Sequence, residues 1–144
     1  MANFYTYKEL KAVGQIGHNT LIHADCLEAM SYIDDASIDM ILADLPYGWL
    51  STTACHWDSI IPLEPLWAHY KRVIKPRGAI VLTASQPFTS VLVMSNLEWF
   101  KYEWIWDKII PSGMNFAKYQ PMRQHENIIV FCNGVAKYNP QMIK

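Results

Sequence analysis

The chain has 144 residues, of which 51% are hydrophobic and 13% aromatic, and its formal net charge is −1. This length suits one domain with a real core, and the composition excludes disordered and low-complexity proteins. A net charge near zero gives no global support for nucleic-acid binding. The apolar runs are too short to span a bilayer, and the first residues lack the pattern of a signal peptide.

The three cysteines are Cys26, Cys55 and Cys132, an odd number at wide spacing. This usage is typical of reduced thiols rather than of a disulfide framework, so we expect a cytoplasmic protein. No pair of cysteines or histidines has a metal-ligand spacing such as Cys-x-x-Cys. The sequence therefore predicts no metal site.

The chain is expected to be a single domain, with a peripheral arm over residues 1–19 and a core over 20–133. A β-prone run over 20–25 is followed by helical spacing over 26–33 and by an apolar strand over 38–43. A strand, a helix and a second strand in this order are typical of a βα crossover. The sequence therefore predicts an α/β fold.

Strands and helices also alternate in the rest of the chain. The predicted elements are a helix over 62–74, a strand over 79–83, a helix over 88–97, and strands over 100–110 and 126–132. Residues 48–61 and 111–124 lack periodicity and are expected to be long loops, which in compact domains are usually functional or mobile.

One stretch suggests a ligand site: the apolar strand ends abruptly at Asp44, and Leu45, Pro46 and Tyr47 follow. In open α/β sheets, ligands bind at the carboxyl ends of the strands, which is where this carboxylate is expected. Pro46 biases Leu45 toward an extended conformation and so directs its carbonyl. An acid, a directed carbonyl and an aromatic ring predict a pocket for a planar polar group such as a base.

Three blocks of sequence resemble the β-class amino-group DNA methyltransferases, of a phage- or prophage-like kind. Asp44, Leu45, Pro46 and Tyr47 are similar to the catalytic Asp-Pro-Pro-Tyr motif, with leucine in place of the first proline. Residues 23–28 (His-Ala-Asp-Cys-Leu-Glu) resemble the block that precedes that motif, and residues 124–131 resemble the downstream His-Glu strand. An acid rather than a serine in the first catalytic position favours adenine N6 over cytosine N4.

The resemblance implies a Rossmann-like sheet with helices on both faces, and methyl transfer from S-adenosylmethionine to an adenine flipped out of double-stranded DNA. The exocyclic amine of adenine is a poor nucleophile because its lone pair is delocalised into the ring. Acceptors on Asp44 and on the Leu45 carbonyl would draw its hydrogens and free that lone pair. Pro46 would restrict the carbonyl, and Tyr47 would stack on the base.

The cofactor side of the site is expected at Asp25 and Cys26, with Asp44 facing both ligands. By resemblance, the Asp25 side chain and the Cys26 backbone N–H contact the adenine of S-adenosylmethionine. Asp25 is also a good helix N-cap, with Glu28 three residues later as in a capping box, and both roles can coexist. For Cys26 the simpler interpretation is a small buried residue.

Four residues in the last part of the chain are candidates for the target base or DNA: Lys118, Arg123, His125 and Glu126. By resemblance, His125 and Glu126 line the target pocket, but they are equally expected to pair at the start of a strand. The tryptophans of the region, such as Trp104 and Trp106, are interpreted as core and strand packing rather than as a base-stacking platform.

The chain lacks the glycine-rich cofactor block, which in the β class follows the target-recognition segment. We therefore expect an incomplete domain in which residues 134–144 begin the missing segment, and two central strands are absent between the strands of Asp25 and Asp44. Exposed strand edges predict a homodimer or other self-association. The chain alone is expected to bind S-adenosylmethionine weakly and to methylate nothing measurable. The alternatives are an RNA or small-molecule amine methyltransferase and a non-catalytic DNA-binding or assembly module.

Overall fold

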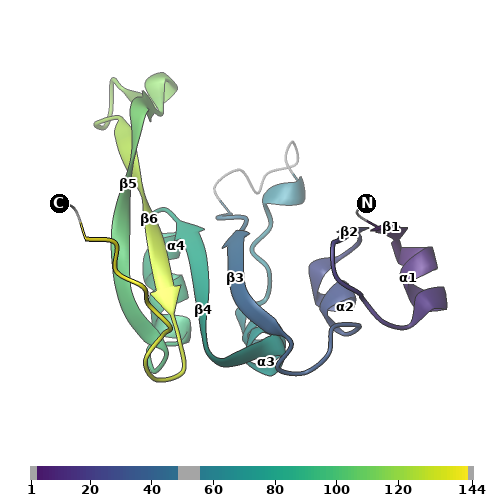
Figure 1. The fold of residues 1–144 in the computed structure, drawn as a ribbon. Coiled ribbons are helices and arrows are strands. Elements are labelled where there is room, and N and C mark those ends of the chain that lie inside the picture. Colours follow the sequence, from purple (N-terminus) through teal and green to yellow (C-terminus); the bar gives the residue numbers. More distant parts are fainter. Residues whose placement is uncertain (1–2, 49–55, 143–144) are drawn as a thin grey trace.

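The computed structural model describes residues 3–48 and 56–142 (Figure 1). Its elements, in chain order, are β1 (Asn3–Thr6), α1 (Tyr7–Val13), β2 (Thr20–His23), α2 (Cys26–Met30), β3 (Ile38–Asp44), α3 (Leu63–Val73), β4 (Ile74–Ala84), α4 (Phe88–Ser95), β5 (Phe100–Ser112) and β6 (Arg123–Phe131), with 3-10 turns at His56–Asp58 and Met114–Phe116. The predicted α/β class is confirmed. Half of the predicted loop over 48–61, including Cys55, lies outside the described residues.

Four strands form the main sheet, in the order β3-β4-β6-β5. β3 runs parallel to β4, while β6 is antiparallel to both β4 and β5. The register places Asp44 opposite Thr83, so two polar side chains lie together where these parallel strands end. β4 is longer than predicted because it begins directly after α3. Its pairing with β3 shifts register between Ile38 and Met40, so residues 75–78 of β4 bulge out of the ladder.

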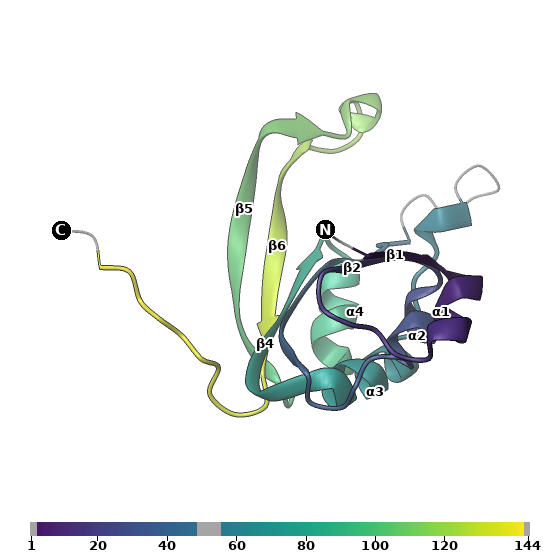
Figure 2. The same cartoon turned by 45° about the vertical axis from the view of Figure 1, so that its right-hand side comes forward.

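The core lies where α3 and α4 pack against the main sheet, on the same side of it (Figure 2). In α3 the buried residues recur at helical spacing: Leu66, Trp67, Tyr70 and Val73. The Trp67 ring lies 4.8 Å from that of Phe131 between centroids, and its N–H donates to Ser95 Oγ at 2.8 Å. No helix among residues 3–48 and 56–142 is long and apolar enough to cross a membrane.

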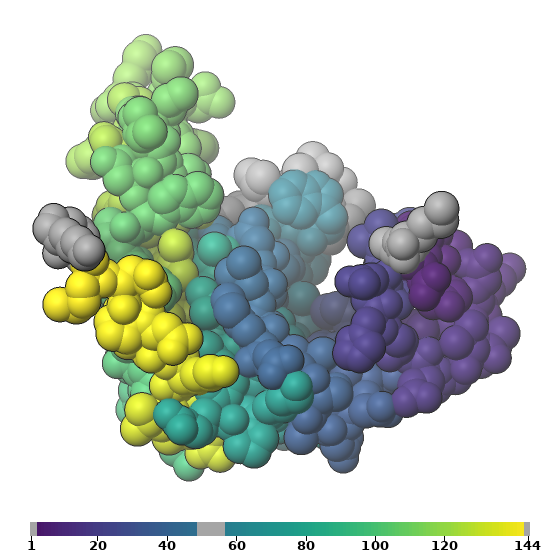
Figure 3. Space-filling view, viewed as in Figure 1, coloured from purple at the N-terminus to yellow at the C-terminus, as the bar shows by residue number. Residues whose placement is uncertain are grey.

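The first part of the chain forms a separate two-stranded sheet in which β1 runs parallel to β2. β1 was not predicted, because four residues without alternation carry little strand signal. Within the described chain, β2 and β3 are not paired, and Figure 3 shows the surface hollowed between them. Arg72 of α3 ties the two parts together: its guanidinium donates to the carbonyls of Met30 at 2.6 Å and Ile33 at 2.7 Å.

β5 and β6 form a long hairpin that extends beyond the end of β4 (Figures 1 and 2). It is longer than predicted at its tip, since the strands reach Ser112 and resume at Arg123. The interpretation of the tryptophans as packing residues is wrong for two of them: Trp104 is 49% exposed and Trp106 is 47% exposed. The reason is that, among the described residues, β5 has only β6 beside it and no helix covers its outer half.

Candidate functional site

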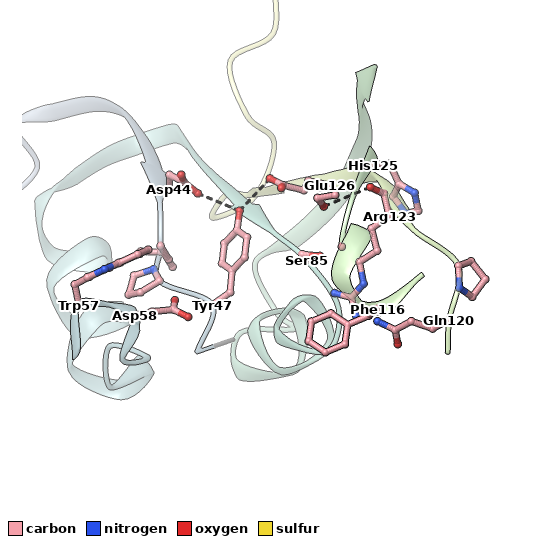
Figure 4. A pocket seen from close by; sticks show the side chains of 15 residues that line it. Asp44, Tyr47, Trp57, Asp58, Ser85, Phe116, Gln120, Arg123, His125 and Glu126 are labelled. Atoms are coloured by element: carbon pink, nitrogen blue, oxygen red, sulfur yellow. Dashed lines mark hydrogen bonds between the residues drawn. The ribbon is translucent and has the colours of Figure 1, made fainter. Parts of the chain in front are cut away.

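A cavity of about 500 Å³ lies at the carboxyl edge of the main sheet, between the end of β3 and the hairpin. Residues 44–47 form one wall, together with Trp57, Asp58 and Ser85. The hairpin supplies the other wall, through Ser112, Gly113, Phe116, Gln120, Pro121, Arg123, His125 and Glu126 (Figure 4). Segments far apart in the sequence thus enclose one space around the predicted catalytic stretch.

The Tyr47 hydroxyl is the centre of a hydrogen-bond network that joins three strands (Figure 4). Its oxygen lies 3.0 Å from Asp44 Oδ1, 2.9 Å from Thr83 Oγ1 and 3.4 Å from Glu126 Oε2. The Thr83 hydroxyl in turn donates to Asp44 Oδ1. These bonds hold the Asp44 carboxylate through one oxygen, and the side chain remains exposed on the cavity side.

Tyr47 is held as a neutral phenol. Burial raises the pKa of Tyr47 well above its usual range, and the nearby carboxylates of Asp44 and Glu126 raise it further, while the bond with Thr83 acts in the other direction. The ring also stacks on Phe88, with centroids 5.6 Å apart and planes at 22°. A ring fixed on one face and a hydroxyl that stays protonated give this side chain a defined orientation.

The second carboxylate of the network, Glu126, forms an ion pair with Lys108 at 2.6 Å. The Glu126 side chain is 17% exposed and that of Lys108 is 30% exposed, so the pair is shielded from bulk water. A paired Glu126 adds less negative potential beside Asp44 than a free carboxylate would. The sequence did not identify Lys108 because its partner comes from the neighbouring strand.

Leu45, the departure from the family motif, is 7% exposed and belongs to the hydrophobic core. Asp44 before it is exposed and Pro46 after it is partly buried, so the Leu45 side chain is the part of the motif that packs in the core. After the motif, Gly48 has a φ of +74°, and a Cβ at this position would lie 2.7 Å from Ile60. Only glycine avoids both the strain and this close approach. The Gly48 N–H donates to Asp58 Oδ1 at 3.1 Å, so both ends of the stretch are fixed.

Asp25 lies two residues after the end of β2 and is the N-cap of α2. Its Oδ1 accepts from the backbone N–H groups of Leu27 at 2.9 Å and Glu28 at 3.2 Å. The expectation of a buried Cys26 is wrong, because this residue is exposed at the first position of α2. Partial burial and the adjacent Asp25 charge raise the pKa of the Cys26 thiol, which therefore stays protonated. Neither residue lines the cavity.

Three of the four candidate DNA-contact residues line the cavity: Arg123, His125 and Glu126. Lys118 lies instead on the exposed tip of the hairpin. Thr83 was missed, although a hydroxyl at the end of a strand parallel to that of Asp44 is a signal that sequence can supply. Within the described part of the chain, no three acidic, histidine or cysteine side chains are grouped so that they could hold a metal ion.

No protein-family model matches the sequence. Among solved structures, that of the M1.HpyAVI–SAM complex superposes with a TM-score of 0.56 at 18% identity, over 100% of this chain and 62% of that chain. The PvuII DNA methyltransferase, which is cytosine-N4-specific, gives 0.57 at 15% identity, over 95% of this chain and 52% of that one. TTHA0409 from Thermus thermophilus, in complex with S-adenosyl-L-methionine, gives 0.55 at 16% identity, with 82% and 56% covered.

The chain thus spans between half and two thirds of the length of each of these three proteins. The sequence identities are all below 20%, so the similarity to these proteins is a similarity of fold. The expected Rossmann-like methyltransferase fold is confirmed, and the chain covers only part of it.

Proposed function

We propose that this chain forms the target-binding part of a DNA methyltransferase that transfers a methyl group from S-adenosylmethionine to N6 of a flipped-out adenine. The observation that carries the proposal is the placement of Asp44 and Tyr47 at the mouth of a cavity of about 500 Å³ on a methyltransferase fold. A cavity of that size can accommodate a base.

In this proposal the amine hydrogens are bound by two acceptors, the Asp44 carboxylate and the Leu45 carbonyl. Thr83 and Tyr47 bond Oδ1 of Asp44, which leaves Oδ2 to accept from the amine. The amine nitrogen would bond to the methyl carbon as the bond from that carbon to the sulfonium sulfur breaks. The nitrogen would become positively charged, the preorganised Asp44 carboxylate would stabilise that charge, and one amine proton would then leave to water. Tyr47, supported from behind by Phe88, would stack on the base with about 1–3 kcal/mol.

Asp25 and Cys26 are the proposed contacts of the cofactor, which supplies the methyl group when bound. The residues fit an adenine edge: Asp25 uses Oδ1 as the helix cap, and its other carboxylate oxygen can accept from an amino group. The first backbone N–H of α2, at Cys26, can donate to a neighbouring ring nitrogen. Both residues are exposed, so no rearrangement of the core is required.

Double-stranded DNA is the proposed partner, with Arg123, His125 and Glu126 at the cavity and Lys118 at the hairpin tip. The two acids Asp25 and Asp44 lie on sheets that are not paired with each other. We therefore propose that the chain alone binds S-adenosylmethionine weakly and yields no measurable methylation. The free thiols of Cys26 and Cys132 support a cytoplasmic location, and self-association through strand edges is part of the same proposal.

Base binding can be tested without turnover, by the fluorescence of DNA that carries 2-aminopurine at the target position. We expect fluorescence to rise as the base leaves the stack, and Tyr47→Ala to weaken this binding by about tenfold or more. Asp39→Ala is the matched control, because Asp39 is exposed and its ion pair with Lys75 lies outside the cavity lining. Equal binding by wild type and Tyr47→Ala would refute the assignment of the base pocket.

Cofactor binding and chemistry need separate measurements. Equilibrium dialysis of S-adenosylmethionine should show a loss of affinity for Asp25→Asn, in which the amide oxygen keeps the helix cap but the second acceptor is replaced by a donor. Labelled methyl transfer to DNA should be undetectable for the chain alone. If label appears, identification of the methylated base distinguishes adenine N6 from cytosine N4, and the proposal of an inactive chain is wrong.

A further inference from the structure

β5 is the edge strand of the main sheet, and its outer side has no strand beside it in the described part of the chain. Such an edge presents unpaired backbone N–H and C=O groups to any extended partner. In Figures 1 and 2 the outer half of the hairpin stands clear of the helices, while its lower half lies beside α4. The strand is 13 residues long and has a proline only near its end, at Pro111.

The two faces of β5 carry different side chains. One face presents an aromatic row of Tyr102, Trp104 and Trp106, which are 39%, 49% and 47% exposed. The opposite face carries Glu103, Ile105 and Asp107, and Lys101 precedes them at a register shift between Phe100 and Tyr102. Exposed aromatic surface of this extent marks an interaction site, and the charges beside it select among partners.

Symmetry restricts how two copies of this edge can pair. Directly opposed residues of antiparallel strands have their side chains on the same face of the sheet. A twofold axis perpendicular to the sheet must therefore pass between the two copies of one residue, which lie opposite each other. Regular pairing of β5 with β6 runs from Tyr102 to Asp107, and a φ of +66° at Ile109 interrupts the strand beyond it. The axis is therefore expected near the middle of residues 102–107.

The charges distinguish the three central choices. An axis at Glu103 would place two Glu103 carboxylates opposite each other, and an axis at Ile105 would place Glu103 opposite Asp107. Like charges directly opposite destabilise a strand pair. With the axis at Trp104, Lys101 of each copy, next to the end of the regular stretch, comes near Asp107 of the other copy, within reach of its long side chain. Of these three central registers, only this one brings two pairs of opposite charges together.

The remaining contacts of this register are also compatible. Trp104 meets its own copy, and Tyr102 meets Trp106 of the second copy, so two exposed rows merge into one row of aromatic pairs. Glu103 is already occupied by Asn127, which donates to it at 2.9 Å. Asp107 accepts from the Ile109 N–H at 2.9 Å and from Gln124 at 3.1 Å through Oδ1, which orients its carboxylate on the strand.

We propose that two copies of this chain associate through antiparallel pairing of their β5 strands, with Trp104 on the twofold axis and reciprocal Lys101–Asp107 ion pairs. The occupant of this edge is a second copy, because the edge is complementary to itself in sequence. The inference stands on the hairpin alone and does not depend on the proposed methyl transfer.

Sedimentation velocity over a concentration series tests the association. We expect a monomer–dimer equilibrium whose dissociation constant rises at least about tenfold in Lys101→Asp and in Asp107→Lys, since each turns two attractive pairs into two repulsive ones. The double variant Lys101→Asp/Asp107→Lys restores the pairs and should recover the wild-type dimer. A monomer at all concentrations, or a dimer that is indifferent to Lys101→Asp, would overturn the proposal.

Cysteine cross-linking tests the register itself, in a background where Cys26 and Cys55 are serine. Trp104→Cys should form a symmetric intermolecular disulfide, because opposed residues of antiparallel strands bring their Cα atoms to about 4.5–5.5 Å. Trp106→Cys should not cross-link with itself but should cross-link with Tyr102→Cys when the two variants are mixed. Self-linking of Trp106→Cys at the rate of Trp104→Cys would contradict the register.

Discussion

The main sheet and the first 33 residues of the chain are stabilised in different ways. Against the main sheet, α3 and α4 bury a continuous core in which Leu66, Leu82 and Ile129 are fully inaccessible. In the first part the described buried side chains are Leu10, Ala29 and Met30, while apolar residues of β1 and β2 remain exposed. Burial of apolar surface is the dominant stabilising term, so the two regions should differ widely in local stability.

This difference matches the division of the proposed site. Asp44 and Tyr47 belong to the well-packed region, where their bonds to Thr83 and Glu126 come from neighbouring strands of one sheet. Asp25 belongs to the region with fewer buried side chains, which is joined to the rest by the polar ties of Arg72 and by the packing of Met30 against the main core. The proposed target-binding half is therefore preorganised, and the proposed cofactor half is expected to open more easily.

The largest effect is expected from a cavity in the core. Leu66→Ala should lower the free energy of unfolding by about 2–5 kcal/mol, because the side chain is fully buried and its space cannot be refilled. Leu21→Ala, at a position in β2 that is 61% exposed, should change it by less than about 0.5 kcal/mol. Urea denaturation followed by circular dichroism measures both, and similar losses would mean that the two regions are equally packed.

A smaller effect is expected where the two regions meet. Arg72→Met should cost about 1–3 kcal/mol, since it removes the donors of the Met30 and Ile33 carbonyls. Hydrogen exchange should accelerate over residues 20–33 while the amides of β4 and β6 stay protected. Lys75→Met, which breaks an ion pair with the exposed Asp39, is the control and should cost under about 1 kcal/mol. Uniform acceleration across the chain would show that the regions do not open separately.

The helix cap at Asp25 should make a modest contribution within the weaker region. Asp25→Ala removes the acceptor of two backbone N–H groups and should cost about 0.5–2 kcal/mol. Asp25→Asn should retain most of that stability, because the amide oxygen can still cap α2. Thermal denaturation compares the three proteins. Equal melting temperatures for Asp25→Ala and wild type would show that this cap does not stabilise the fold.

The smallest effect concerns ionisation in the stronger region. Because the folded state raises the pKa of Tyr47, its phenol stays protonated while an unfolded tyrosine ionises near pH 10. The contribution of the protonated Tyr47 to the free energy of unfolding is complete below about pH 10. It is lost as the pH rises above that value, because the unfolded chain then releases a proton that the folded chain keeps. Tyr47→Phe should flatten this decline. At about pH 11 the folded Tyr47→Phe variant should have the same tyrosinate absorbance as the folded wild type. In denaturant the absorbance of the variant should be lower by one eighth, because it has seven tyrosines instead of eight.

Much of the site was predictable because it is local in the chain. Asp44, Leu45, Pro46 and Tyr47 are consecutive, and the apolar run before them ends at the acid. The network that orients them was not predictable in the same way. Lys108 and Glu126 are brought to this edge by antiparallel pairing, and the length of the hairpin was underestimated because proline, glycine and polar residues over 111–124 resemble a loop.

The amino-acid sequence by itself determined the α/β class, the order of strands and helices from β2 onward, and the acid at the end of β3, because hydrophobic periodicity and turn residues act over a few neighbours. The tertiary structure decided what surrounds that acid. Strand pairing placed Thr83 and Glu126 beside Tyr47, separated β2 from β3, and left Trp104 on an open edge. These are relations between distant segments, and they are set by register and packing rather than by any local pattern.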